Sequence, residues 1–328
     1  MEIGKVPNNI LKDIILGKLV NNRSEILVRP GIGEDCCVVD FGEYSCVMSS
    51  DPITGTANDV GRLAVHVTCN DIAACGVEPL GLIVTILAPP GTMEYELETI
   101  MDQLIKASSS INVDIMGGHT EITSAVTRFV IICTAVGKVL KDKAVTTGGA
   151  KTGDCLVLTK SAGIEGTAII AFEKEKELLI QFGAELVKEA KNFMESISVV
   201  REGIIAAEFG VSAMHDVTEG GVLGAVWEMC EASGTGAEIY SSSIPISVST
   251  ERICEYYGID PLRLISSGSM LIAAEDGEGL VRKLKEENIN ASIIGKLVQS
   301  GRKIYYNGKE PVNILQPESD ELYKVCGR

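Results

Sequence analysis

Four short segments of the chain place acidic or amide side chains just past apolar runs. They span residues 31–35, 49–54, 69–76 and 116–121. Carboxylate and amide oxygens are the ligands that a hard divalent cation requires. Glycines beside them let the backbone amides come close to the phosphates of a nucleoside triphosphate. We therefore expect a metal-dependent nucleotide site, with the first, second and fourth segments on turns.

Three aspartates in these segments, Asp35, Asp51 and Asp71, are candidate Mg²⁺ ligands. Mg²⁺ takes few carboxylates and keeps water or phosphate oxygens at its other positions. The alternative is that each aspartate caps a helix or a turn. That alternative suits Asp71 poorly, because it lies among apolar residues of a predicted helix, and a buried carboxylate needs a partner. Asn70 is expected to hydrogen-bond a phosphate or to orient Asp71.

The fourth segment combines two glycines with a histidine and a glutamate. We expect Gly117, Gly118 and Thr120 to contact the nucleotide. His119 and Glu121 are candidate catalytic residues, because a histidine in a glycine turn is not expected in a core. The histidine would hydrogen-bond a phosphate, or the glutamate would supply the carboxylate.

A fifth segment, in the second half of the chain, combines a carboxylate, a hydroxyl and a glycine pair at the start of a predicted helix. Its candidate ATP-binding residues are Asp216, Thr218, Gly220 and Gly221. Amides at the start of a helix bind anions, and the glycines allow an anion to come close. The alternative is a helix cap made by Thr218 with a nearby glutamate.

The usual triphosphate loop, in which glycine directly precedes lysine and then serine or threonine, is absent. Lys151 and Lys160 are followed by such a hydroxyl residue but are not preceded by glycine. We therefore expect ATP to bind through metal-bridged phosphates.

Composition limits the partners and the compartment. The 328 residues carry a net charge of -16, which argues against nucleic acid and against an anionic membrane as partners. No signal peptide or membrane-spanning run is recognised. The ten cysteines include no pair spaced by two residues, as expected for core thiols in a reducing cytoplasm.

Helical and strand patterns alternate along the whole chain, which predicts mixed α/β layers. Helices are expected at 8–19, 59–75 and 178–193, among others, and strands at 45–49, 81–87 and 128–137. A Gly- and Thr-rich stretch at 146–154 predicts a boundary between two domains, 1–148 and 149–328. The expected fold class is α+β.

In this order, the segments resemble the aminoimidazole ribonucleotide (AIR) synthetase superfamily of ATP-dependent enzymes. The most specific segments are 70–76 and 216–221, and 260–268 is similar to the hydrogenase maturation family HypE. The resemblance implies ATP and Mg²⁺ as cofactors and two α/β domains. It also implies a homodimer in which the first domains of two copies close a β-barrel, with the nucleotide at its edge.

The family resemblance also gives the C-terminal cysteine a role. HypE proteins end on a cysteine whose thiol carries a carbamoyl group, which ATP-dependent dehydration converts to a thiocyanate, and a carbamoyltransferase of the HypF type is the implied partner. Here the candidate is Cys326, which Gly327 and Arg328 follow. The segment 316–328 has few apolar residues, so we expect a mobile tail that packs weakly.

Two other functions stay open at this stage. One is a superfamily enzyme that acts on a free small molecule, such as a thiamin-monophosphate kinase or a selenophosphate synthetase. The other is a nucleotide-binding scaffold without activity, which is suggested by the unusual tail and by His119, where much of the superfamily has an acidic residue.

Overall fold

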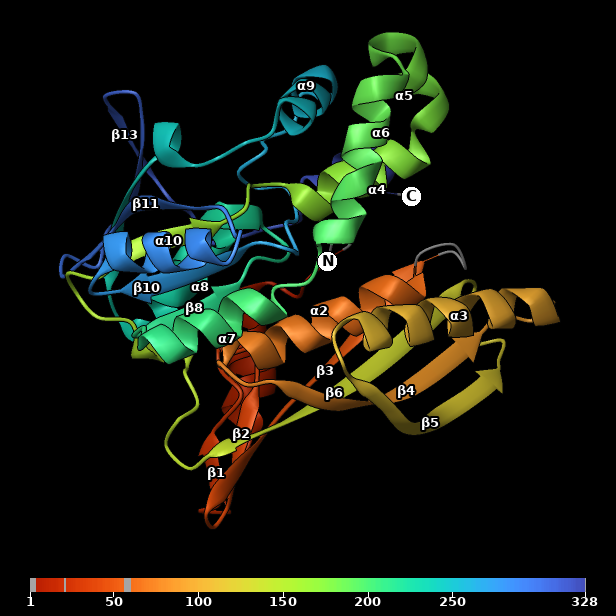
Figure 1. The fold of residues 1–328 in the computed structure, drawn as a ribbon, viewed down its shortest axis with the longest axis horizontal. Coiled ribbons are helices and arrows are strands. Elements are labelled where there is room, and N and C mark those ends of the chain that lie inside the picture. The colour runs from red at the N-terminus through yellow and green to blue at the C-terminus, as the bar shows by residue number, and fades with distance from the viewer. Residues whose placement is uncertain (1–3, 21, 56–59, 328) are drawn as a thin grey trace.

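The computed structural model describes residues 4–20, 22–55 and 60–327, and Figure 1 shows its ribbon. Two mixed α/β domains follow one another along the chain. The first is built on a six-stranded sheet of order β1-β2-β3-β6-β4-β5, and the second on a seven-stranded sheet of order β13-β12-β9-β11-β7-β10-β8. The structure thus agrees with the expected α+β class.

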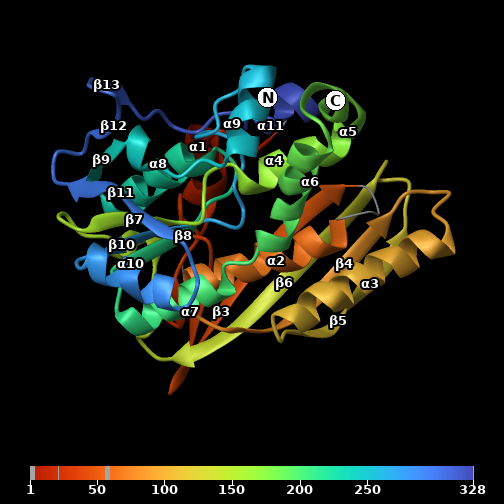
Figure 2. The ribbon, with the colours of Figure 1, turned by 45° about the horizontal axis from the view of Figure 1, so that its top comes forward.

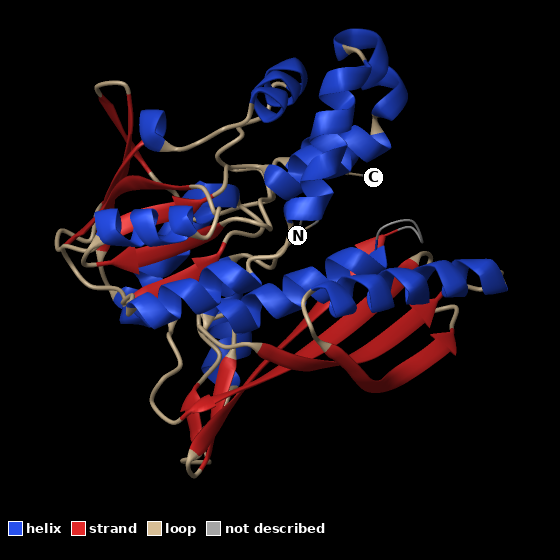
Figure 3. Ribbon diagram, viewed as in Figure 1, coloured by secondary structure: helices blue, strands red, loops and turns tan. Residues whose placement is uncertain are grey.

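In the first domain, two helices cover one face of the sheet (Figure 3). Strand β6 alternates buried and half-buried residues over most of its length, the period of a strand with one face on a core. The elements of this domain are β1 Ile26–Val28, β2 Cys37–Phe41, β3 Tyr44–Gly55, α2 Val60–Ala74, β4 Pro79–Ala88, α3 Glu94–Ser110, β5 Asp114–Ile122 and β6 Phe129–Leu140. They agree with the predicted helix at 59–75, although residue 59 itself lies outside the described residues.

In the second domain, strand β10 lies inside its sheet between β7 and β8, and every residue of it is buried. The strands are β7 Cys155–Thr159, β8 Ala213–Asp216, β9 Gly236–Tyr240, β10 Met270–Ala274, β11 Ala291–Val298, β12 Lys303–Asn307 and β13 Glu310–Asn313. The longer helices are α4 Ile164–Glu173, α5 Glu175–Phe182, α6 Ala184–Asn192, α7 Val200–Phe209, α8 Gly221–Ser233, α9 Val248–Tyr257 and α10 Gly277–Glu286. The single helix predicted at 178–193 is wrong, because the chain breaks between α5 and α6 at Gly183, whose φ is 82°.

The chain ends are also helical. Residues predicted as one helix at 8–19 form a short α-helix, α1 Asn8–Ile10, then a π-helical turn Leu11–Ile15 and a 3₁₀ turn Leu16–Lys18. Helix α11, Leu322–Cys326, lies beside α4 and α9 near the N-terminus (Figure 2). None of the helices in the described part of the chain is long and apolar enough to cross a membrane.

Two segments expected on turns lie inside strands instead. Residues 49–54 belong to β3 and residues 116–121 to β5. The register places Asp51 opposite Cys133 of β6, Cys133 opposite Val84 of β4, and Val84 opposite Gly118 of β5. Asp51 and Gly118 are thus about three strand spacings, or roughly 14 Å, apart across the sheet.

The glycine at position 118 has a structural reason that the turn prediction overlooked. A Cβ added there would lie 1.8 Å from the carbonyl oxygen of Val84. Only glycine fits such a close approach of two strands. Gly118 therefore allows β5 to lie against β4, and the segment does not form the predicted loop.

The two domains meet along α2 and α7. The side-chain amide of Asn70 donates from Nδ2 to the carbonyl of Ile197 at 2.9 Å, and its Oδ1 accepts from the amide of Val199 at 2.9 Å. Gly203 of α7 lies directly against the backbone of Ala73, where a Cβ would be 2.1 Å from the carbonyl oxygen. The predicted phosphate contact of Asn70 does not agree with this placement, because both polar atoms of its amide hold the second domain.

Candidate metal and nucleotide site

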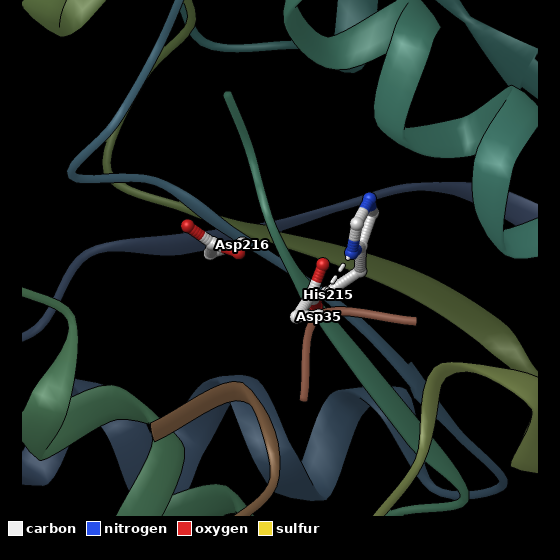
Figure 4. Close-up of side chains that lie close together, drawn as sticks. All are labelled: Asp35, His215 and Asp216. Atoms are coloured by element: carbon white, nitrogen blue, oxygen red, sulfur yellow. Dashed lines mark hydrogen bonds and ion pairs between the residues drawn. The ribbon is translucent and has the colours of Figure 1, made fainter. Parts of the chain in front are cut away.

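Four aspartates from different elements gather at the junction of the two domains. Asp35 lies in the loop before β2, Asp51 in β3, Asp71 in α2 and Asp216 at the end of β8. One ligand atom from each of Asp35, His215 and Asp216 lies within 4.8 Å of the others (Figure 4). Asp216, which we had expected to contact the nucleotide, thus lies beside the three aspartates that were predicted as metal ligands.

Asp71 is buried, and its carboxyl lies close enough to the other three aspartates to feel their charges. Burial raises the pKa of its carboxyl well above the usual range, and the nearby carboxylates of Asp216 and Asp51 raise it further. The hydroxyl of Ser49 donates to Oδ2 of Asp71 at 2.5 Å. A buried carboxylate surrounded by other carboxylates is costly unless a cation joins it.

Asp216 has the same need for a positive partner. Burial raises its pKa to about 7, and Asp35 and Asp51 add to the increase, whereas His215 and Lys5 oppose it. Among the described residues, Oδ2 of Asp216 and Oδ2 of Asp51 are buried without a hydrogen-bond partner. Oxygens of this kind, supplied by carboxylates, fit Mg²⁺, which takes one or two carboxylates together with phosphate oxygens and water.

His215 of β8 links Asp35, in the loop before β2, to Glu228 of α8. Its Nδ1 lies 2.8 Å from Oδ2 of Asp35, and its Nε2 lies 3.0 Å from Oε2 of Glu228. Burial alone would lower the pKa of the imidazole, but Asp35 and Glu228 together raise it well above its usual range. The pKa of Glu228 is lowered despite burial, because Lys5 and His215 favour its charged form.

The N-terminal segment adds a cation that the sequence did not indicate. Nζ of Lys5 donates to Oγ1 of Thr218 at 3.2 Å, and the amide of Lys5 donates to Oε2 of Glu219 at 3.0 Å. Loss of solvation would lower the pKa of Lys5, but Glu228 and Glu219 outweigh it and raise the pKa. Thr218 therefore contacts an ammonium group and does not cap α8, for which no side-chain cap is present.

The amide of Gly220, just before α8, binds a carboxylate, but this carboxylate belongs to the chain itself. Gly220 and Gly221 have φ angles of 90° and 62°, and the amide of Gly220 donates to Oδ2 of Asp320 at 2.7 Å. The other oxygen of Asp320 accepts from the amides of Ile265 and Leu322 at 3.1 and 2.8 Å. The predicted anion-binding amide thus anchors the C-terminal tail in this structure.

The tail packs more firmly than its composition predicted. Asp320 is buried, and the hydroxyl of Tyr323 donates to Oε1 of Glu219 at 2.9 Å. Cys326, at the end of α11, packs against the apolar cluster of α4, α5, α6 and α9. The expected weak packing is wrong for this helix, because two polar side chains and a short apolar face fix it to the second domain.

His119 and Glu121 lie apart from the four aspartates within one copy of the chain. Their side chains are 64% and 54% exposed, and Nε2 of His119 lies 3.3 Å from Oε2 of Glu121. Thr120 and Gly117 are also exposed on this edge strand. Within one copy of the chain, the structure therefore does not bring residues 116–121 to the four aspartates.

A separate cleft of about 990 Å³ runs along the domain junction. Arg62 and His66 of α2 line one side, and Arg201 and Glu202 of α7 line the other. None of the four aspartates is among the residues that line this cleft. The candidate site is therefore defined by the carboxylate oxygens and not by the cleft.

Two members of the site were not identified from the sequence. Glu228 is a buried carboxylate within the otherwise apolar first turns of α8, and such a residue in an apolar helix is a signal for a charged partner. Lys5 has no comparable signal, since it stands between Gly4 and Val6 ahead of the first helix.

Two family models match this chain. The N-terminal domain of AIR synthase related protein matches residues 33–139, and the C-terminal domain of the same family matches residues 151–306. A putative hydrogenase expression/formation protein of Methanocaldococcus jannaschii is 30% identical over 98% of this chain and 97% of its own length. Carbamoyl dehydratase HypE of Cupriavidus necator is 26% identical over 85% of this chain and 82% of its own.

Solved structures share the fold. A chain of the HypE-HypF complex superposes with a TM-score of 0.77 at 22% identity, covering 94% of this chain and 99% of its own. HypE in complex with ATP gives 0.70 at 21% identity, with 97% and 96% covered. AaThiL complexed with AMPPCP and TMP gives 0.77 at 16% identity, with 97% and 98% covered.

Proposed function

Because the chain belongs to the AIR synthase-related family, we propose that it is an ATP-dependent carbamoyl dehydratase of the HypE type in [NiFe]-hydrogenase maturation. Relatives that align with most of the chain carry that activity in their names. The observation that carries the proposal is the group of four aspartates at the domain junction, two of which have buried oxygens with no hydrogen-bond partner in the described part of the chain.

The aspartates Asp35, Asp51, Asp71 and Asp216 would hold Mg²⁺ together with the ATP phosphates. ATP supplies the phosphoryl group that turns an amide oxygen into a good leaving group, and the metal offsets the phosphate charge. The chain contributes a preformed, largely buried set of oxygens from both domains. Lys5 lies beside this set and would meet the phosphates as a second positive group.

In the proposed reaction, the substrate is a carbamoyl group on the sulfur of Cys326. The amide oxygen takes the γ-phosphoryl group, and phosphate then leaves with that oxygen while the nitrogen loses its protons. The product is a thiocyanate on the same sulfur. Net loss of one water is thereby coupled to cleavage of ATP.

For Cys326 to reach the aspartates, α11 must leave the apolar cluster of α4, α5, α6 and α9 against which it packs. The base of the tail is already near the site, because Tyr323 and Asp320 bind the segment that directly follows Asp216. Only the residues that follow Asp320 must therefore move, and the contacts of Asp320 with the amides of Gly220 and Ile265 keep the base of the tail in place.

We further propose that the protein is a homodimer. The six-stranded sheet has a face that no helix covers (Figure 3), and exposed apolar side chains on its last two strands include Leu80 and Ile83 of β4 and Met116 of β5. Pairing of this face with a second copy would cover them and close a barrel, as the family resemblance implies. His119 and Glu121, exposed on β5, would then lie at the dimer interface, where they could contact a nucleotide.

A carbamoyltransferase of the HypF type is the proposed donor of the carbamoyl group, in a cytoplasmic setting. This partner is supported by the HypE-HypF complex among the chains of similar fold. The C-terminal cysteine is the point at which the two enzymes would meet.

A second candidate, a kinase that acts on a free small molecule, is favoured by the packing of Cys326 into an apolar cluster. The fold of AaThiL, a chain complexed with AMPPCP and TMP, is equally similar. In this case the tail would be structural, and no carbamoyl group would form.

Consumption of ATP by two variants separates the candidates. For the dehydratase, Cys326→Ala abolishes ATP consumption in the presence of the carbamoyl donor system and leaves ATP binding intact, because the tail supplies no metal ligand. Asp51→Asn abolishes consumption under either proposal. If Cys326→Ala turns over ATP as the wild type does, the dehydratase proposal is wrong and the kinase candidate stands.

A further inference from the structure

The imidazole of His215 is held between two carboxylates that come from different parts of the chain. On one side Nδ1 lies 2.8 Å from Oδ2 of Asp35, and on the other Nε2 lies 3.0 Å from Oε2 of Glu228. The three side chains are 4%, 12% and 8% exposed, respectively for His215, Asp35 and Glu228. Carboxylates only accept hydrogen bonds, so each ring nitrogen donates to its partner.

This arrangement decides between two roles for His215. Its position beside Asp35 and Asp216 (Figure 4) suggests a metal ligand at first sight. A ring nitrogen binds a metal through its lone pair, however, and a nitrogen that donates its N–H has no lone pair to offer. Both nitrogens are used in this way, and Mg²⁺ prefers oxygen ligands. The ring is therefore placed to hold Asp35.

Asp35 lies in a loop that has one backbone turn hydrogen bond, from the amide of Glu34 to the carbonyl of Gly31, and that is also held by the amide of Gly148, which donates to Oε1 of Glu34. Residues 30–36 lie between β1 and β2 without forming a helix or a strand. Gly33 of this loop, with φ of 78°, touches the backbone of Glu228, where a Cβ would come 2.8 Å from the carbonyl oxygen. The loop is thus pressed against α8 at Gly33 and fastened to it through Asp35, His215 and Glu228.

We propose that His215 is a positioning residue for Asp35. Its Nδ1–H holds Oδ2 of Asp35, which would leave the other carboxylate oxygen for a divalent cation, and Glu228 holds the ring at Nε2. This inference rests on the proposed metal site. Partners of this kind, one step removed from the metal, change metal affinity by about 10- to 100-fold when they are removed.

The test compares two amides at position 215. The side-chain amide of asparagine overlies the Nδ1 side of a histidine ring and can still donate to Asp35. The amide of glutamine reaches the Nε2 side and faces Glu228. Mn²⁺ binding to the full-length chain without nucleotide is measured by titration calorimetry, and thermal unfolding verifies that each variant is folded.

We expect His215→Asn to bind Mn²⁺ at least about tenfold more tightly than His215→Gln. Equal affinities of the two variants contradict the proposal. Directly bound ¹⁴N in the electron spin-echo spectrum of the Mn²⁺-loaded wild type contradicts it as well, because His215 would then be a ligand. If the wild type itself binds no Mn²⁺, the metal site and this inference both fail.

Glu228 is tested by a double-mutant cycle, since loss of its charge alone weakens cation binding in any background. If Glu228 acts through His215, Glu228→Gln lowers Mn²⁺ affinity in the wild type and has a smaller effect in His215→Asn, whose amide does not reach Glu228. An equal effect in both backgrounds shows simple charge attraction and overturns the role of Glu228. Glu231→Gln, on the same helix but paired with Lys303 at the surface, is the control and leaves the affinity unchanged.

Discussion

Replacement of Asp216 by asparagine should stabilise the metal-free protein while it abolishes stabilisation by metal. Asp216 is 1% exposed, and its Oδ2 has no partner among the described residues. A carboxylate in such a place opposes folding whenever it is charged. The charged form of Asp216 therefore lowers the stability of the fold, and a bound cation would remove this cost.

The size and the sign follow from the pKa of Asp216. Folding raises it from 3.8 to about 7. A carboxyl with a raised pKa adds stability that is fully present below about pH 4 and is lost as the pH rises through about 7. At pH 8 the charged form costs about 4 kcal/mol at most, from about 1.4 kcal/mol per pKa unit. The amide in Asp216→Asn leaves an unpaired polar group that costs about 1–3 kcal/mol. The net gain should be about 1–3 kcal/mol.

The assay is urea unfolding of both proteins at pH 5 and pH 8, in EDTA and in excess Mg²⁺. In EDTA, Asp216→Asn should be more stable than the wild type at pH 8, with a smaller difference at pH 5. Mg²⁺ should stabilise the wild type and not the variant. Asp154→Asn is the control, because Asp154 is also buried but accepts a hydrogen bond from the amide of Lys151 at 2.9 Å, so no gain is expected. A variant less stable than the wild type at pH 8 in EDTA refutes the reasoning.

Three further outcomes are expected. Asp71→Asn should lower the affinity for ATP with Mg²⁺ at least about tenfold, or about 1.4 kcal/mol, in titration calorimetry, and unchanged binding removes Asp71 from the site. Light scattering should give a dimer for the wild type at micromolar concentration and a monomer for Ile83→Glu. Ile180 is 89% exposed on α5, so Ile180→Glu should remain a dimer. A monomeric wild type contradicts the proposed dimer. Asp320→Ala should speed hydrogen exchange in α11, because three amides lose their acceptor; unchanged exchange means that Asp320 is not the anchor.

The sequence pointed to the aspartates that lie together in the structure, but not to the side chains that surround them. Asp35, Asp51 and Asp71 could be named because a carboxylate within or next to an apolar run stands out against its neighbours. Their meeting with Asp216 depends on how two domains pack, which no local pattern records. Contacts of high sequence separation, such as that of Asp35 with His215, are invisible to periodicity.

The errors have a common physical origin. Residues 49–54 and 116–121 contain turn formers, and local propensity favoured loops, but pairing with neighbouring strands placed both segments in a sheet. Asn70 precedes a site residue, yet on a helix adjacent residues point in different directions. Asn70 therefore faces the second domain while Asp71 faces the carboxylates.

The tail shows how composition misleads when a few residues are well placed. Its low apolar content predicted weak packing, but one carboxylate meets three amides, and Tyr323 reaches Glu219. A short segment can be fixed by such contacts without a core of its own.

The proposed dehydration is tested most directly by the mass of the C-terminal peptide. The protein is first incubated with a HypF-type carbamoyltransferase and a carbamoyl donor, then separated from them and supplied with ATP and Mg²⁺. The peptide that contains Cys326 should gain a carbamoyl group in the first step and lose the mass of one water in the second. A peptide that takes up no carbamoyl group, or that keeps it unchanged after ATP and Mg²⁺ are added, contradicts the proposed function.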